Sequence, residues 1–137
     1  MKGYTTGVFD LFHIGHLNIL KRAKEMCDYL IVGVSTDELV SSYKNKTPII
    51  PYAERKSIVE AIRYVDEVVP QCSLDKIAAH ALYKYDVLFQ GDDWKSSPVY
   101  RDTIEIFSKM GIDIVLFPYT VGTSSTLLSE VLHKALI

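Results

Sequence analysis

The stretch TTGVFDLFHIGHLNIL, residues 5–20, contains the pattern on which the fold depends. A short strand-like run, Tyr4 to Phe9, is followed by a helical pattern whose apolar positions extend from Leu17 to Cys27. His13 and His16 stand between them on either side of a glycine. Two imidazoles buried there would need partners for all their ring nitrogens, so the pair is not ordinary core. A strand that leads at once into a helix predicts the opening of an α/β unit.

The alternation of strand and helix continues along the chain. The run Tyr29 to Ser35 is apolar and β-branched, as in a strand that is covered on both faces. The predicted strands are residues 4–9, 29–35, 67–69, 86–90 and 113–117, and the predicted helices are residues 17–27, 53–63, 75–83, 101–110 and 125–136, with a polar loop at 41–51. We therefore expect one α/β domain over residues 1–137, Rossmann-like, with a five-stranded parallel sheet and helices on both faces.

Composition excludes several classes of protein. Of 137 residues, 48% are hydrophobic and 23% are charged, which is ordinary for a globular domain. The formal net charge of −2 argues against nucleic-acid binding through overall positive charge. A binding site for an anion would therefore depend on a few local groups. Without a signal-peptide pattern or a run of about 18 apolar residues, we expect a cytoplasmic protein with no membrane segment. Cys27 and Cys72 form no CxxC pair, and we expect free thiols.

Polar segments follow four of the predicted strands. They are residues 7–16, 44–46, 91–94 and 120–126. In a parallel α/β sheet, ligands bind beyond the carboxyl ends of the strands, near the point where the strand order reverses. Each segment alone has an ordinary explanation, such as solvated lysines, a capped turn or a helix cap. Their common position at one edge of the sheet favours a single binding site.

The histidine pair admits three interpretations. Gly7 would allow a tight turn after the first strand, and Gly15 would leave room for an anion at the helix start. The unpaired amides of the first helical turn would add a partial positive charge, which together with His13 and His16 makes a phosphate site. Two solvated histidines, or a zinc site completed by a carboxylate such as Asp92, remain as alternatives.

Four motifs resemble one family. GVFDLFHIGH at 7–16 is similar to the HxGH motif of the nucleotidyltransferase superfamily, in the form carried by cytidylyltransferases. RYVDEV at 63–68 resembles the second motif of that family, and TVGTSST at 120–126 is similar to its third, usually RTEGIST. GDDW at 91–94 matches a segment of bacterial glycerol-3-phosphate cytidylyltransferases. The resemblance extends from Gly7 to the final predicted helix.

The resemblance implies transfer of CMP from CTP to a small phosphorylated alcohol, glycerol-3-phosphate-like, with release of pyrophosphate. It implies Mg²⁺ with CTP as the substrate, and a homodimer. Catalytic roles fall on His13, His16, Lys44 and Lys46, and contacts with the acceptor or its phosphate on Lys46, Arg55 and Tyr119. Nucleotide contacts are implied for Gly7, Val8, Phe9, Asp10, Arg63, Gly91, Asp92, Thr120, Ser124, Ser125 and Thr126, with Asp10 and Asp92 also the candidates for magnesium.

The chain departs from the family pattern at several positions. Tyr119 stands where the third motif begins with arginine, and Val121 and Thr123 replace its glutamate and isoleucine. Val8 gives GVFD, the form seen in choline-phosphate cytidylyltransferases, where bacterial glycerol-3-phosphate enzymes usually read GTFD. Choline phosphate and ethanolamine phosphate are therefore alternative acceptors. An adenylyltransferase and a non-catalytic nucleotide-binding relative are the remaining alternatives.

Overall fold

The computed structural model describes residues 1–118 and 130–132. Its five strands are β1 (Lys2–Gly7), β2 (Tyr29–Ser35), β3 (Glu67–Gln71), β4 (Val87–Gly91) and β5 (Asp113–Phe117). They form one sheet in the order β3-β2-β1-β4-β5, and every neighbouring pair is parallel. The predicted five-stranded parallel sheet is confirmed. The order reverses between β1 and β4, which places a ligand crevice beyond the carboxyl ends of these two strands.

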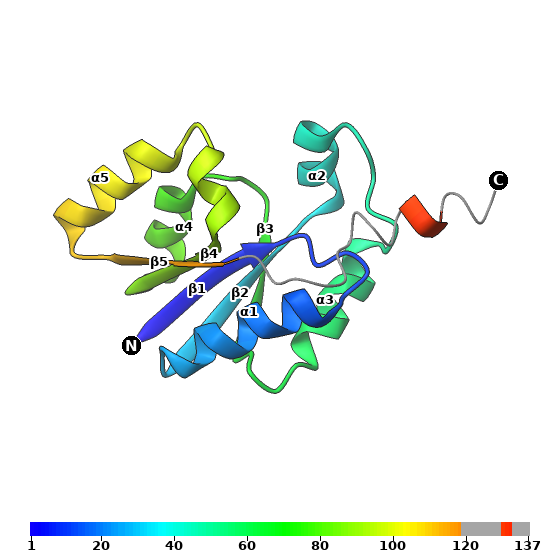
Figure 1. The fold of residues 1–137 in the computed structure, drawn as a ribbon, viewed down its shortest axis with the longest axis horizontal. Coiled ribbons are helices and arrows are strands. Elements are labelled where there is room, and N and C mark those ends of the chain that lie inside the picture. Colours follow the sequence, from blue (N-terminus) through cyan, green and yellow to red (C-terminus); the bar gives the residue numbers. More distant parts are fainter. Residues whose placement is uncertain (119–129, 133–137) are drawn as a thin grey trace.

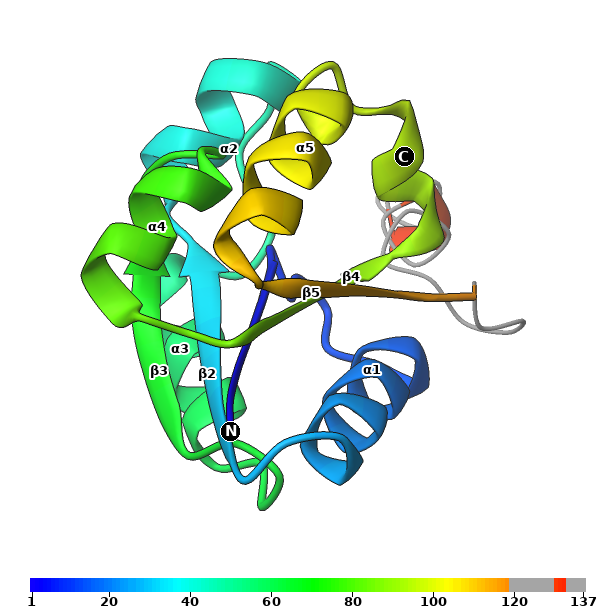
Figure 2. The ribbon, with the colours of Figure 1, turned by 90° about the vertical axis from the view of Figure 1, so that its left-hand side faces the viewer.

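Helices cover both faces of the sheet, as expected. They are α1 (Ile14–Glu25), α2 (Asp37–Lys44), α3 (Tyr52–Glu60), α4 (Lys76–Tyr83) and α5 (Tyr100–Met110), with a short 3₁₀ helix, η1 (Asp92–Ser96), after β4. Figure 1 shows the strands running through the middle of the molecule, and Figure 2 shows α1 and α3 on one face and α4 and α5 on the other. The sheet is thus the central layer of three.

Alternate residues of β2 explain why its sequence is apolar throughout. Leu30, Val32 and Val34 belong to the core cluster that includes Leu20 of α1. Ile31 belongs to the second cluster, on the face covered by α4 and α5. Because successive side chains of a strand point to opposite faces, a strand covered on both faces has apolar residues at successive positions.

The helix α2 was not predicted, and the polar loop expected at 41–51 was wrong over its first residues. Thr36 caps α2 by accepting a hydrogen bond from the Leu39 amide at 3.2 Å. Two acidic residues in the first turn interact favourably with the positive end of the helix dipole, and Asn45 ends the helix with a left-handed φ of 54°. The Val40 side chain of α2 is buried. These signals were present in the sequence.

Other boundaries differ from the predicted ones by a few residues. β1 ends at Gly7, so Val8 and Phe9 lie beyond the strand. Residues 130–132 are helical, and the rest of the helix expected at 125–136 lies outside the described residues. No helix within 1–118 or 130–132 combines the length and apolar character needed to cross a bilayer.

Candidate active site

The turn between β1 and α1 places two non-glycine residues in left-handed backbone conformations. Phe9 and Leu11 have φ of 55° and 50°, a region that costs an ordinary side chain about 1–2 kcal/mol. Gly7, which was expected to supply the turn, instead provides space, because a Cβ there would lie 3.0 Å from the Phe9 ring. Phe9 is 5% exposed and packs in the core under α1. The Phe9 side chain is therefore a packing group, and the predicted contact of this residue with the nucleotide stays a prediction.

His13 is the N-cap of α1, and backbone amides hold both histidine rings. Nδ1 of His13 accepts from the Gly15 amide at 3.0 Å, and Nδ1 of His16 accepts from the His13 amide at 3.2 Å. The rings stack with centroids 3.9 Å apart. Because each Nδ1 accepts a hydrogen bond, each neutral ring carries its proton on Nε2. The pair therefore offers two neighbouring Nε2–H donors to a ligand.

The surroundings of the pair keep both rings uncharged at neutral pH. Burial and, to a smaller extent, the neighbouring His13 lower the pKa of His16 to about 4, and Asp10 partly opposes the change. Burial also lowers the pKa of His13. An uncharged imidazole that donates from a fixed position can bind a phosphate oxygen without changing its protonation.

Asp10 ties this turn to the segment before α3. Its two carboxylate oxygens accept hydrogen bonds from the amides of Ile49, at 2.8 Å, and Ile50, at 2.9 Å. Figure 1 shows the turn after β1 and the segment between α2 and α3 at the same end of the molecule. The structure thus gives Asp10 an anchoring role, and its predicted contacts with the nucleotide and magnesium stay predictions.

Arg55 of α3 is fully buried and does not reach the solvent side of the site. Its guanidinium donates to the carbonyls of Ile50, Val8 and Ser35 at 2.7 to 2.8 Å, and to Oδ1 of Asp37 at 2.6 Å. These bonds join the β1–α1 turn, the end of β2, the start of α2 and the segment before α3. The structure thus gives Arg55 a positioning role, and its predicted phosphate contact stays a prediction. Val8 takes part through its carbonyl.

Lys44 and Lys46 lie at the end of α2 and just beyond it, and both are exposed. Partial burial and the charge of Lys46 lower the pKa of Lys44, whereas Asp10 and Asp93 raise it. These electrostatic partners come from three of the predicted segments. Lys44, the β1–α1 turn and η1 thus lie close enough to one another for their charges to interact.

Gly91 and Asp92 lie where β4 ends and η1 begins. A Cβ on Gly91 would lie 2.8 Å from Oδ1 of Asp93, so the glycine leaves space for that side chain. Asp92 is exposed. Within residues 1–118 and 130–132, no three His, Cys, Asp or Glu side chains are grouped to hold a metal ion, the His13, His16 and Asp92 set included. Because Mg²⁺ is usually bound by one or two carboxylates together with substrate phosphates, the expected Mg²⁺ stays a prediction.

Arg63 lies at the opposite edge of the sheet from the predicted site residues that the structure describes at the carboxyl ends of the strands. It precedes β3, at the amino edge of the sheet, and its side chain donates to the hydroxyl of Tyr64 at 2.9 Å. The structure does not bring Arg63 to the carboxyl edge, and its predicted contact with the nucleotide stays a prediction. Tyr119, Thr120, Ser124, Ser125 and Thr126 lie outside the described residues.

A buried polar layer under the carboxyl edge was not predicted. Its members come from the ends of four strands and the start of α4, and they are Thr6, Ser35, Gln71, Gln90 and Lys76. The sequence carried a signal for it, because β1, β2, β3 and β4 each have a polar residue at or next to their last position. A polar side chain at the end of an apolar strand is ambiguous until its partners are known.

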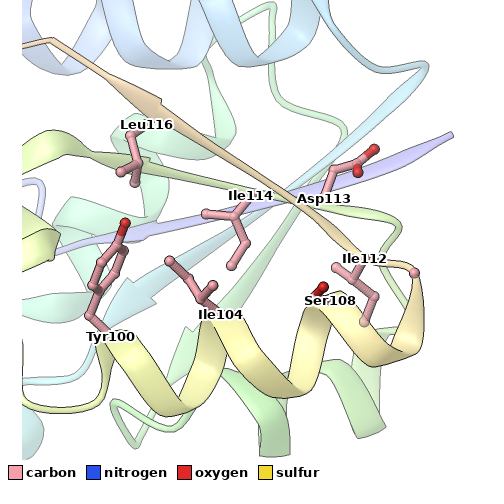
Figure 3. A pocket seen from close by; sticks show the side chains of 8 residues that line it. Tyr100, Ile104, Ser108, Ile112, Asp113, Ile114 and Leu116 are labelled. Carbon is pink, nitrogen blue, oxygen red and sulfur yellow. The ribbon is translucent and has the colours of Figure 1, made fainter.

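A groove of about 350 Å³ lies elsewhere, between α5 and β5 (Figure 3). It is lined by Tyr100, Ile104, Ser108, Gly111, Ile112, Asp113, Ile114 and Leu116. None of the predicted site residues is among them. The groove borders an edge strand and is separate from the histidine and lysine cluster.

Known proteins resemble this chain over nearly its whole length. The glycerol-3-phosphate cytidylyltransferase of Bacillus subtilis (strain 168) is 39% identical over 130 residues, which are 94% of this chain and 95% of that protein. The FAD synthase of Pyrococcus horikoshii is 35% identical over 134 residues, 93% of this chain and 87% of that one. A lipopolysaccharide core biosynthesis protein from Thermoplasma volcanium GSS1 shares the fold, with a TM-score of 0.71 at 24% identity, covering 90% of this chain and 98% of that one.

The family itself is recognised across almost every described element. Residues 4–133 match the family described as cytidylyltransferase-like. That range begins in β1 and includes the histidine pair, the lysines and η1. The resemblance that the four motifs indicated is confirmed, and the chain belongs to the cytidylyltransferase-like family.

Proposed function

We propose that this protein is a nucleotidyltransferase that moves CMP from CTP to a small phosphorylated alcohol. The observation that carries the proposal is the stacked pair of His13 and His16, with both Nδ1 atoms held by backbone amides and both Nε2–H groups left as donors. Lys44 and Lys46 supply local cations of the kind that a polyphosphate requires in a chain of net charge −2, and Lys44 interacts electrostatically with Asp10 of the turn that leads to the histidines. The family and the cytidylyltransferase relative support the same activity.

The proposed reaction needs no nucleophile from the protein. A phosphate oxygen of the acceptor attacks the α-phosphorus of CTP, and the bond from that phosphorus to the bridging oxygen breaks. Pyrophosphate leaves with the electron pair, and the product is a CDP-alcohol. His13 and His16 donate to phosphate oxygens, while Lys46 and Lys44 offset the charge that develops on them. Catalysis then consists of positioning and electrostatic stabilisation.

The acceptor is proposed to resemble glycerol 3-phosphate. The intact GDDW segment at 91–94 supports this choice, as does the relative from Bacillus subtilis. Choline phosphate and ethanolamine phosphate are the alternative acceptors, suggested by Val8 and Tyr119. The match to an FAD synthase keeps a different nucleotide substrate as a competing proposal.

The remaining expectations belong to this proposal. Mg²⁺ is expected to arrive with CTP and to be bound chiefly by its phosphates, since both carboxylate oxygens of Asp10 accept backbone amides. A homodimer and a cytoplasmic location follow from the family resemblance and the sequence pattern, and neither is needed for the chemistry above.

The test is a pyrophosphate-release assay on the purified protein with Mg²⁺. Each of the four nucleoside triphosphates is combined with glycerol phosphate, choline phosphate or ethanolamine phosphate. We expect release with CTP and glycerol phosphate, because a pocket that pairs with one base leaves polar groups unpaired with another. Equal rates with ATP would replace the proposal by adenylyl transfer, and no release with any pair would leave a nucleotide-binding protein without turnover.

Two variants connect that activity to the histidine pair. His16→Ala should lower the rate by about 10²–10³-fold, as loss of one donor to a developing charge does, while circular dichroism reports an intact fold. His80→Ala is the matched control, because His80 packs against Tyr85 and Phe107 on another face of the sheet. A normal rate in folded His16→Ala protein would remove the proposed role.

A further inference from the structure

Leu11 adopts a left-handed backbone in the turn between β1 and α1, with a φ of 50°. Bulky side chains rarely occupy this region, which favours glycine and asparagine. Phe9, the other left-handed residue of the turn, packs into the core under α1. Leu11 is only half-buried and belongs to neither of the two core clusters that the described residues form. Its side chain therefore indicates a role other than core packing, as strained residues at binding sites do.

The residues on either side of Leu11 hold the turn in this conformation. The Asp10 carboxylate accepts two backbone amides of the segment before α3. The Phe12 ring packs against the His16 ring, with 5.2 Å between their centroids. The neighbours thus have partners of their own, and they fix the backbone between them. A strained conformation persists where the surrounding structure determines it in this way.

Ile49 is a second apolar residue at the same place. It is 48% exposed, and its backbone amide donates to Oδ2 of Asp10 at 2.8 Å. Leu11 directly follows Asp10 in the chain, so Leu11 and Ile49 flank one carboxylate. Together they offer apolar surface that a bound ligand would remove from water, which is favourable in proportion to the area covered.

The charged and polar neighbours of these two residues suit the phosphate of an organic ligand. Leu11 lies shortly before His13, whose Nδ1 is held by a backbone amide so that Nε2–H is the donor, and Ile49 lies shortly after Lys46. A histidine donor and a lysine charge bind phosphate oxygens, but they give nothing to the carbon atoms attached to the phosphate. Binding sites for small molecules usually combine a few such polar groups with apolar walls.

We propose that Leu11 and Ile49 form an apolar wall of the active site and contact the carbon part of a bound organic phosphate. That this ligand is a substrate of nucleotidyl transfer rests on the proposed function. The carbon part belongs either to the nucleoside of the triphosphate or to the alcohol of the acceptor. Both present carbon–hydrogen surface next to a phosphate, and binding experiments separate the two sources.

Calorimetric titration with two pairs of ligands in the presence of Mg²⁺ provides the test. CTP is compared with pyrophosphate, and glycerol 3-phosphate with inorganic phosphate, so that each pair differs in its carbon part. Leu11→Ala should weaken binding of CTP or of glycerol 3-phosphate about tenfold, as expected when part of a leucine side chain loses an apolar contact. Its affinity for pyrophosphate and for inorganic phosphate should not change. Ile49→Ala should weaken binding of the same carbon-bearing ligand.

Leu82→Ala and Ile106→Ala are the matched controls. Leu82 on α4 is 73% exposed and Ile106 on α5 is 39% exposed, and these helices cover the face of the sheet opposite α1 (Figure 2). Both control variants should bind all four ligands like the original protein. A loss confined to CTP then assigns the wall to the nucleoside, and a loss confined to glycerol 3-phosphate assigns it to the alcohol.

Leu11→Gly separates a ligand contact from a packing role. Glycine adopts a φ of 50° without strain, so the urea midpoint of this variant should stay the same or rise, while the carbon-bearing ligand binds as weakly as to Leu11→Ala. A lower midpoint with normal binding would mean that the side chain serves the fold. Equal losses for CTP and pyrophosphate would mean a displaced histidine pair. Either result, or normal affinity of folded Leu11→Ala for both carbon-bearing ligands, overturns the proposal.

Failure of the proposed function gives a different result. If the original protein binds ATP and not CTP, adenylyl transfer replaces cytidylyl transfer. The comparison of ATP with pyrophosphate then tests the same contact of Leu11, with the same expected tenfold loss. The apolar wall is thus judged by the difference between ligands with and without a carbon part, and the proposed function by which nucleotide is bound.

Discussion

Removal of the Arg55 guanidinium should destabilise the whole carboxyl edge of the sheet. The side chain is fully buried and donates four hydrogen bonds, three to carbonyls and one to Asp37. Arg55→Met leaves those three carbonyls and the Asp37 carboxylate without their donor. Breaking a buried ion pair by deleting one partner costs about 3–5 kcal/mol, a large part of the roughly 5–15 kcal/mol that holds a domain folded.

The partner side of the same ion pair predicts a smaller effect. The Asp37 side chain is 35% exposed, so solvent already screens it and can hydrate it when the pair is broken. Asp37→Asn should therefore cost about 1 kcal/mol. Arg55→Lys should recover only part of the loss, because one ammonium cannot reach the four acceptors that the planar guanidinium connects.

Urea unfolding followed by circular dichroism measures these free energies. Arg101→Met is the matched control, because Arg101 is exposed on α5 and should change the free energy of unfolding by less than about 0.5 kcal/mol. The folded fraction of Arg55→Met should also turn over CTP more slowly, since the Val8 carbonyl and the Ile50 segment lose their anchor. A cost below about 1 kcal/mol for Arg55→Met would refute the positioning role.

Three further outcomes follow from the site. A histidine in the unfolded chain is protonated near pH 6.5, whereas His16 in the folded protein is protonated only near pH 4. The free energy of unfolding should therefore fall as the pH drops through this window, by an amount of the order of 3 kcal/mol. A series of urea denaturations at different pH values should show a smaller fall for His16→Asn. The asparagine of Asp10→Asn has one carbonyl oxygen and can replace only one of the two carboxylate oxygens that accept backbone amides. Urea unfolding should therefore show a free energy of unfolding lower by about 1–2 kcal/mol. Lys46→Ala should lower kcat by about 10²-fold or more and change CTP affinity less, because the lysine acts on charge that develops in the transition state. Steady-state kinetics measures kcat and calorimetry measures the affinity; equal losses in kcat and in affinity would contradict that role.

The sequence by itself determined the parallel sheet and the edge at which the site lies. The continuous apolar run of β2 predicted a strand covered on both faces, and the alternation of strands and helices predicted the parallel order. Because the carboxyl ends of parallel strands share one edge, His13, Lys44 and Gly91 could be assigned to the same site before any distance was known. These inferences depend on local patterns and on the chirality of strand connections, and neither requires side-chain partners.

The roles of individual polar residues were decided only by tertiary structure. Arg55, Asp10 and Lys76 all look like isolated charged residues in the sequence. In the structure, Arg55 donates to backbone carbonyls, Asp10 accepts from two backbone amides, and Lys76 is buried among neutral groups. The same applies to Gly7, which makes room for the Phe9 ring instead of turning the chain. A hydrogen bond joins residues that are distant in sequence, so whether a charged group is free for a ligand depends on contacts that only the folded chain creates.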